Sequence, residues 1–402
     1  MAIRTAKANK PIAISRWRMN AVLLVAVLGI GGVSLRLGNL QIVQHDTLTQ
    51  LARGEINQEI KIPPRRGTIR DRAGNVLALD VDRESLFVVP QQIDQRNAPR
   101  LALMLSSLLG RPASEIQIAL QDQTKLWVPL TRWLDPEIAK QVQKLAEVEN
   151  EPGLRMIYEP RRVYPQGSLA AQTIGAVNFE GVGISGVEGY YDDVLKGVTG
   201  TITAEVDAQQ NPIWIAPQQS TPASNGADLE LTLDPLVQHV IETELKAAVE
   251  KHSASGGTVI VLDPRTGAIR GMASYPTFDP NRYNDYSPEM YNINPAVGKV
   301  YEPGSTFKIV TVSAGLQVGA FTPETQVDDP GIIDRYDTTI GNFDQNGHGM
   351  ITPGDVLMYS SNVGALRFNE LTGPEKFYDI VHKYGFGKPT GVDLAGEEAG
   401  IV

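Results

Sequence analysis

Ser305 and Lys308 stand three residues apart, a spacing that could support nucleophilic chemistry. Pro303-Gly304 ends the preceding segment, and the residues that follow read as a helix that is apolar on almost every side. Residues three apart on a helix share a face, so the lysine amine can reach the serine hydroxyl. Burial disfavours the charged ammonium and lowers the lysine pKa, so that a neutral amine could take the serine proton. The pair predicts a serine nucleophile with a lysine base.

A second polar motif, Ser360-Ser361-Asn362, begins 55 residues after Ser305. Thr352-Pro353-Gly354-Asp355 predicts the start of a helix, which should break at Ser360-Ser361-Asn362. The Ser360 hydroxyl can relay a proton between Lys308 and a leaving amine, and Asn362 can hold Lys308 and a substrate carbonyl. Serine and lysine at this spacing also occur by chance, so the combination of the two motifs carries the prediction. Ser-x-x-Lys with Ser-x-Asn is the paired signature of penicillin-recognising serine acyltransferases.

The elements that must position these motifs indicate an α+β fold with antiparallel strands. Residues 216–226 are rich in Pro, Ser and Gln and predict a linker before a new domain. Asp234-Pro235 is an N-cap followed by proline at the first helical position. The elements predicted after the linker are a strand at 229–233, a helix over 235–249, and strands at 258–262 and 268–272.

The part of the chain before the linker predicts a second, separate domain. Residues 68–79 read as a hairpin about Ala73-Gly74-Asn75, residues 98–149 as helices, and residues 154–215 as a strand-rich stretch. Residues 181–186 match the spacing of a dinucleotide-binding turn, but no buried apolar strand leads into them. We therefore interpret them as a structural glycine-rich turn.

An apolar N-terminal segment predicts a membrane anchor. Residues 19–35 are 17 uncharged residues, preceded by five cations and no acid. This pattern predicts a cytoplasmic tail at 1–18, a transmembrane helix at 19–42, and everything from about residue 45 outside. A cleaved signal peptide and a buried core helix are the alternatives.

Composition excludes several classes of function. The chain has 402 residues, which predicts two or three domains, and it has no cysteine, which excludes disulfides and thiol chemistry. Without the five leading cations, 31 basic residues face 46 acidic ones, so nucleic acid is not an expected partner. The five histidines lack metal-ligand spacing, and Asp328-Asp329 and Glu397-Glu398 read as solvated charge.

The sequence resembles the class B penicillin-binding proteins along nearly its whole length. Tyr301–Lys308 looks like the active-serine segment of that family and Tyr359–Gly364 like its second motif. Residues 66–72, 162–165 and 183–188 are similar to stretches of its non-catalytic pedestal. The resemblance implies a pedestal at 45–215 and the N-terminal part of a transpeptidase domain at 227–402. It also implies a bacterial membrane-anchored D,D-transpeptidase that cross-links peptidoglycan stem peptides and is acylated by β-lactams.

In the mechanism that the resemblance implies, Ser305 attacks the carbonyl of the penultimate D-alanine of a D-Ala-D-Ala terminus. Lys308 accepts the serine proton, terminal D-alanine leaves, and an amine of a neighbouring stem peptide resolves the acyl-enzyme; no metal or other cofactor is needed. The resemblance also implies a glycosyltransferase partner of the SEDS type, with other division or elongation proteins. Glu302 favours the division type over the elongation type.

The third motif of the family, Lys-Thr-Gly or Lys-Ser-Gly on an edge strand, has one candidate at Lys388-Pro389-Thr390-Gly391. We reject it because the proline interrupts the triplet and cannot donate to a strand ladder. The sequence thus predicts a chain that stops inside its catalytic domain and is by itself poorly active or unstable. Two alternatives stay open: a D,D-carboxypeptidase or β-lactamase that passes the acyl group to water, and an inert scaffold that recruits a glycosyltransferase.

Overall fold

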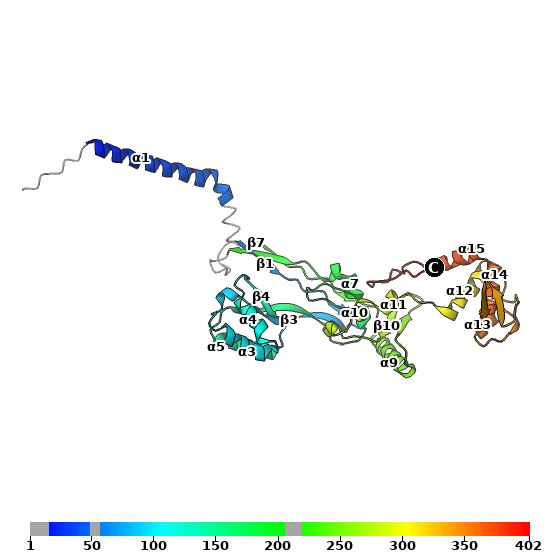
Figure 1. The fold of residues 1–402 in the computed structure, drawn as a ribbon. Helices are drawn as coiled ribbons and strands as arrows, with labels where there is room; N and C mark the ends of the chain where they lie inside the picture. The colour runs from blue at the N-terminus through cyan, green and yellow to red at the C-terminus, as the bar shows by residue number, and fades with distance from the viewer. Residues whose placement is uncertain (1–15, 49–56, 206–218) are drawn as a thin grey trace, which may run out of the picture. The chain divides into compact units, whose positions relative to one another are not determined.

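The computed structural model describes residues 16–48, 57–205 and 219–402 (Figure 1). They form two compact units. The first comprises Met1–Pro63 and Thr199–Ala223, and the second Pro64–Val198 and Ser224–Val402. Helices and antiparallel sheets are both present, in agreement with the predicted α+β class.

The first unit contains the apolar N-terminal helix. Helix α1 spans Arg16–Gly38 and continues into a π-helical turn at Asn39–Val43. The whole stretch is 28 residues long, with a mean hydropathy of 2.1 in its most apolar window and no buried residue in that window. At 1.5 Å per residue it is long enough to cross a bilayer. The predicted span at 19–42 lies within it, whereas most of the predicted tail lies outside the described residues.

The same unit contains a three-stranded antiparallel sheet. Strand β6 (Gly200–Glu205) lies between β1 (Asn57–Ile62) and β7 (Gln219–Thr221). Strand β7 lies inside the predicted linker at 216–226, of which residues 216–218 are outside the described residues.

The second unit begins with a five-stranded sheet around one long strand. Strand β3 (Val76–Val88) pairs antiparallel with β2 (Ile69–Arg70) near its start, with β4 (Val128–Thr131) near its end, and with β5 (Leu154–Val163) along most of its length. The predicted hairpin is confirmed, since Asp71 Oδ1 accepts the backbone N–H groups of Ala73 and Asn75 and fixes the turn. Strand β8 (Leu229–Glu230) pairs with β2 in parallel, so the prediction of only antiparallel strands is wrong there. A strand that returns after so long a connection is free to take either direction.

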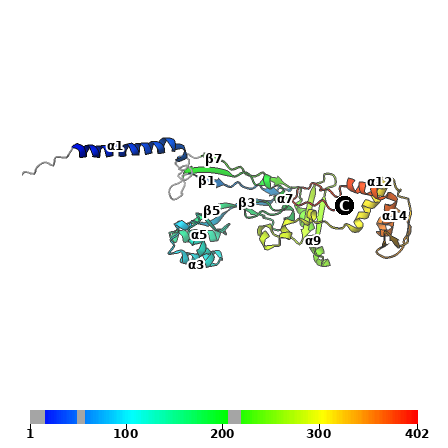
Figure 2. The same cartoon turned by 45° about the horizontal axis from the view of Figure 1, so that its top comes forward.

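Three helices pack beside this sheet, as Figures 1 and 2 both show. They are α3 (Ala98–Leu109), α4 (Ala113–Gln121) and α5 (Pro136–Val148). Their apolar faces meet Leu86 and Val88 of β3 in one core. The helical prediction for 98–149 is confirmed for these helices and wrong for β4, a four-residue strand between them.

The prediction of a strand-rich stretch at 154–215 is wrong between β5 and β6. Three helices of four or five residues occupy that interval: α6 (Ala171–Ile174), α7 (Gly186–Tyr190) and α8 (Asp192–Leu195). Glycines provide the close backbone approaches there, because a Cβ on Gly183 would lie 2.0 Å from the Glu188 carbonyl oxygen. The glycines of residues 181–186 thus serve a tight turn, with Gly181 at a φ of 81°, and close backbone packing.

After β8, a helix and a hairpin form the next layer. Helix α9 (Pro235–His252) is N-capped by Asp234, whose carboxylate accepts the N–H groups of Leu236 and Val237. It packs on β9 (Gly257–Leu262) and β10 (Ile269–Tyr275), an antiparallel pair as predicted. Three short helices follow, at Pro280–Asp285, Pro288–Asn292 (α10) and Pro295–Gly298 (α11).

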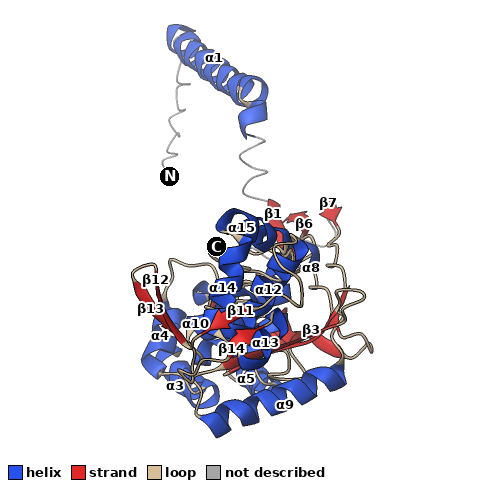
Figure 3. Ribbon diagram, turned by 90° about the vertical axis from the view of Figure 1, so that its right-hand side faces the viewer, coloured by secondary structure: helices blue, strands red, loops and turns tan. Residues whose placement is uncertain are grey.

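The C-terminal elements gather around a small core of their own (Figure 3). Val312, Phe321, Ile351, Val356 and Phe368 form this core. The elements are a 3₁₀ turn at Gly304–Phe307, α12 (Lys308–Gln317), β11 (Val327–Asp329), β12 (Ile332–Arg335), β13 (Thr338–Gly341), β14 (Gly349–Ile351), α13 (Pro353–Tyr359), α14 (Asn362–Thr372) and α15 (Pro374–Lys383).

Helix α12 differs from its prediction as a helix buried on nearly every side. Val312 and Ala314 are buried, but the Ile309 side chain is 63% exposed. The residues around 309 therefore form an open face of the helix, and the apolar sequence pattern alone overstated its burial.

Candidate active site

The four side chains predicted to carry chemistry meet at the amine of Lys308. Its Nζ lies 3.1 Å from Ser305 Oγ and 3.1 Å from Ser360 Oγ. It lies 2.5 Å from the Ser360 carbonyl oxygen and 2.7 Å from Asn362 Oδ1. Two segments more than 50 residues apart in sequence thus share one lysine.

Local backbone geometry places these groups. Ser305 lies in the 3₁₀ turn that leads directly into α12, so it precedes Lys308 by one helical turn. Helix α13 starts with a capping box between Thr352 and Asp355, and it ends at Ser360 in the left-handed conformation, with φ 53° and ψ 39°. This reversal ends α13 as the sequence predicts and turns both the Ser360 hydroxyl and its carbonyl toward Lys308.

The electrostatic setting of Lys308 is unusual for a cation. Only 9% of the residue is exposed, and burial lowers the pKa of its amine from the ordinary lysine value. The partners of Nζ are hydroxyl, carbonyl and amide oxygens, and in the described part of the chain no carboxylate is paired with it. A lysine without a counter-ion is suited to act as a neutral base toward the adjacent hydroxyl.

The sequence patterns did not identify Asp329 and Asn342, which form hydrogen bonds with Ser361 and Asn362. Asp329 is fully buried, so its interpretation as solvated charge is wrong. Asp329 Oδ2 accepts the Ser361 hydroxyl at 2.7 Å, and Asn342 Oδ1 accepts the backbone N–H of Asn362 at 2.9 Å. Strand alternation could have separated Asp329 from the exposed Asp328, but a three-residue strand gives too short a pattern for that signal.

The rejected third-motif candidate lies in a loop. Residues 388–391 belong to no described strand, and the N–H groups of Thr390 and Gly391 donate to the Glu397 carboxylate at 2.6 and 3.0 Å. Glu397, which is partly exposed, therefore also fixes the backbone of this loop.

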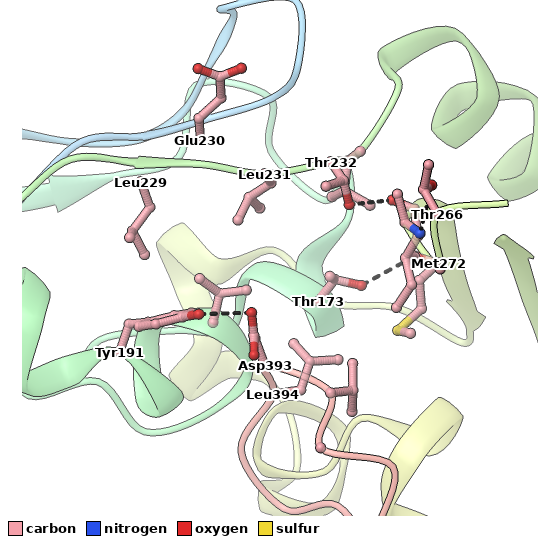
Figure 4. A pocket seen from close by; sticks show the side chains of 17 residues that line it. Thr173, Tyr191, Leu229, Glu230, Leu231, Thr232, Thr266, Met272, Asp393 and Leu394 are labelled. Atoms are coloured by element: carbon pink, nitrogen blue, oxygen red, sulfur yellow. Dashed lines mark hydrogen bonds between the residues drawn. The ribbon is translucent and has the colours of Figure 1, made fainter. Parts of the chain in front are cut away.

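A cavity of about 440 Å³ lies elsewhere in the second unit, and its lining includes none of the four site residues (Figure 4). Leu229 and Leu231 line it, and on another wall the Tyr191 hydroxyl donates to Asp393 Oδ2 at 2.7 Å. This hydrogen bond, with partial burial, raises the pKa of Tyr191 to about 12. Through this hydrogen bond the phenol connects Tyr191 and Asp393 across the lining of the cavity.

Two family models match the chain. The penicillin-binding protein dimerisation domain matches residues 61–231, and the penicillin-binding protein transpeptidase domain matches residues 257–402. In the structural comparison, PBP2 from its complex with MreC of Helicobacter pylori has the same fold, with a TM-score of 0.70 and 21% identity over 86% of this chain and 69% of that one.

Curated relatives align over almost the entire chain. Stage V sporulation protein D of Bacillus subtilis is 33% identical over 390 residues, which are 96% of this chain and 59% of that protein. The probable peptidoglycan D,D-transpeptidase PbpC of Pseudomonas aeruginosa is 30% identical over 390 residues, 96% of this chain and 67% of that protein. With both family models and an N-terminal helix able to span a bilayer, the chain belongs to the class B penicillin-binding proteins and is membrane-anchored.

Proposed function

We propose that the protein is a peptidoglycan D,D-transpeptidase that works through a serine acyl-enzyme. The observation that carries the proposal is the contact of 3.1 Å between Lys308 Nζ and Ser305 Oγ, in a setting that lowers the lysine pKa. Burial disfavours the charged form of this amine, so an amine in contact with the Ser305 hydroxyl can serve as the base for that nucleophile.

In the first half-reaction, Ser305 Oγ forms a bond to the carbonyl carbon of the penultimate D-alanine. The Ser305 proton moves to Lys308 Nζ. The C–N bond to terminal D-alanine then breaks, and the leaving amine takes a proton from Lys308 through the Ser360 hydroxyl, which lies 3.1 Å from Nζ. The products are an ester on Ser305 and free D-alanine.

In the second half-reaction, the amine of a neighbouring stem peptide attacks the ester carbonyl. Lys308, neutral again, accepts a proton from that amine, and Ser305 leaves with a proton restored through the same contacts. Division into two acyl transfers avoids a direct exchange between amides and needs no nucleotide. A D,D-carboxypeptidase or β-lactamase would complete the same cycle with water in place of the amine.

We further propose that the N-terminus is cytoplasmic and that the chain after about residue 45 lies outside the membrane. The cations Arg4, Lys7 and Lys10, with Arg16 and Arg18, precede the apolar residues 19–35, and the first acidic residue is Asp46. The predicted pedestal at 45–215 would then present an outside surface to a SEDS-type glycosyltransferase. The preference for the division type, from Glu302, stays a prediction.

The test is covalent labelling of the protein as the cell makes it. Membranes are incubated with a fluorescent penicillin, and the labelled peptide is identified by mass spectrometry. We expect an adduct on Ser305 and no adduct in Ser305→Ala. An adduct that persists in Ser305→Ala would contradict the proposal. With a D-Ala-D-Ala peptide and an acceptor amine, transfer to the amine supports a transpeptidase, whereas release of free acid alone would favour the hydrolase alternatives.

A further inference from the structure

A buried acid lies behind the second motif of the active site. Asp329, the last residue of β11, is fully buried, and its carboxylate takes part in none of the ion pairs of the described residues. It is instead surrounded by neutral donors. Its oxygens accept the Gly331 N–H at 2.9 Å, the Asn342 side-chain amide at 2.9 and 3.0 Å, and the Ser361 hydroxyl at 2.7 Å. Burial of a charged carboxylate without a counter-ion costs free energy, and the hydrogen bonds from these donors to Asp329 offset that cost.

Asn342 carries the influence of this acid to the active site. The two bonds from its amide nitrogen to Asp329 fix which way its side chain is oriented. Its carbonyl oxygen Oδ1 therefore faces α14, where it accepts the N–H of Asn362 at 2.9 Å and that of Val363 at 3.2 Å. With 5% of its surface exposed, Asn342 has little freedom to turn.

Ser361 forms the second connection. Its hydroxyl donates to Asp329 and accepts the N–H of Gly364 at 2.8 Å, which caps the first turn of α14. Ser361 lies between Ser360 and Asn362, which both contact Lys308 Nζ. Both connections from Asp329 thus end on the segment that surrounds the lysine.

We propose that Asp329 is a positioning residue for the reaction: through Asn342 and Ser361 it holds Ser360 and Asn362 at their distances from Lys308. The inference rests on the proposed function, because it assigns Asp329 a role only in a reaction that uses Lys308. Asp329 itself touches neither Lys308 nor Ser305 in the described contacts, so it acts through the residues between.

The test compares two adjacent acids in the full chain. Asp329→Asn places an amide NH₂ where the Asn342 amide and the Ser361 hydroxyl now donate, which disrupts the connections at unchanged volume. Asp328→Asn makes the same chemical change at the neighbouring exposed position and is the matched control. Stopped-flow acylation by a fluorescent penicillin separates the initial dissociation constant from the acylation rate constant.

For Asp329→Asn we expect the acylation rate constant to fall about 10- to 100-fold, the cost of misplacing a reacting group by a fraction of an ångström to one ångström. The dissociation constant should stay within about threefold of wild type, since Asp329 does not touch the ligand. Asp328→Asn should match wild type in both constants. An Asp329→Asn rate constant equal to that of the control overturns the inference.

A second variant decides the matter if Asp329→Asn does not fold. Ser361→Ala removes one hydroxyl and leaves the buried carboxylate with its other donors. Its acylation rate constant should fall about 10-fold, and a wild-type rate constant in folded Ser361→Ala overturns the inference. A wild-type protein without Ser305-dependent acylation would instead overturn the proposed function, so the two failures are distinguishable.

Discussion

The second unit holds two clusters of polar groups around buried cations, and the partners of the cations differ between the two. In the pedestal cluster, the Glu188 carboxylate accepts from Arg66 Nε at 2.6 Å and from Arg162 Nε at 2.7 Å, and Asp192 and Asp80 each pair with one of these arginines. In the active-site cluster, the partners of Lys308 Nζ among the described residues are all neutral oxygen atoms.

The difference appears in the direction of the pKa shifts. Burial by itself lowers the pKa of a cation in both clusters. For Arg162, attraction to Glu188 and neighbouring groups outweighs burial, and the pKa is raised. For Lys308 burial is the cause of the shift, and the pKa is lowered. Burial with carboxylates therefore makes a permanent ion pair that holds the fold, while burial without them leaves a proton acceptor available for chemistry.

The largest effect should come from removal of the lysine. Lys308→Ala is expected to slow acylation by about 10⁴-fold or more, because the nucleophile and its base act as a unit. The measurement is the rate of fluorescent penicillin acylation, with thermal unfolding as a check on the fold. Lys376→Ala, at an exposed position, serves as the control and should acylate at the wild-type rate. A decrease of less than about tenfold in the acylation rate of Lys308→Ala would contradict the role of Lys308 as the base.

A substitution in the pedestal cluster should lower the free energy of unfolding. Glu188→Gln leaves two buried guanidinium groups short of a carboxylate and is expected to lower the free energy of unfolding by about 3–5 kcal/mol. Chemical denaturation measures this change, and Glu180→Gln, at an exposed position, should stay within about 0.5 kcal/mol of wild type. A stability equal to that of the control would show that the network contributes little to the fold.

A carboxylate introduced beside Lys308 should raise the lysine pKa, as the carboxylates of the pedestal cluster do for Arg162. Asn362→Asp places a carboxylate at the position of an oxygen now 2.7 Å from Nζ, and an opposite charge at such a distance raises a lysine pKa by about 1–3 units. A raised pKa keeps the amine charged over a wider range, so acylation at neutral pH should fall about 10- to 1000-fold and recover as the pH rises. A pH profile with an unchanged midpoint would contradict this account.

The smallest effect concerns the hydrogen bond at the cavity. Tyr191→Phe removes the bond of 2.7 Å to Asp393 and should cost about 1 kcal/mol in unfolding free energy. Since the Tyr191 pKa is raised from 10.0 to about 12, the contribution should be complete below pH 10 and lost as the pH rises toward 12. Unfolding at pH 8 and pH 11.5 measures it. A difference between wild type and Tyr191→Phe that does not shrink at high pH would exclude this role.

The pair at 305 and 308 could be predicted because one helical turn fixes which residues are neighbours. The association of this pair with Ser360 and Asn362 could be predicted because Ser-x-x-Lys and Ser-x-Asn occur together as a paired signature. The helix break at Ser360–Asn362 could be predicted because it depends on local sequence. Asp329 and Asn342 were not predictable, since they reach Ser361 over 32 and 19 residues of sequence. The adjacent Asp328 and Asp329 have the same chemistry, and the three-residue strand β11 is too short for strand alternation to show from sequence which of them is buried.

The left-handed backbone at Ser360 places two selective pressures in conflict at one position. A residue with a Cβ in this conformation costs about 1–2 kcal/mol, a cost that glycine avoids. Glycine would however supply no hydroxyl to Lys308. Under selection for heat tolerance alone, lineages would drift toward glycine there, while a requirement for turnover would retain the less stable serine. A working enzyme of this design therefore carries a local cost of about 1–2 kcal/mol at this residue, which stabilising contacts elsewhere must offset.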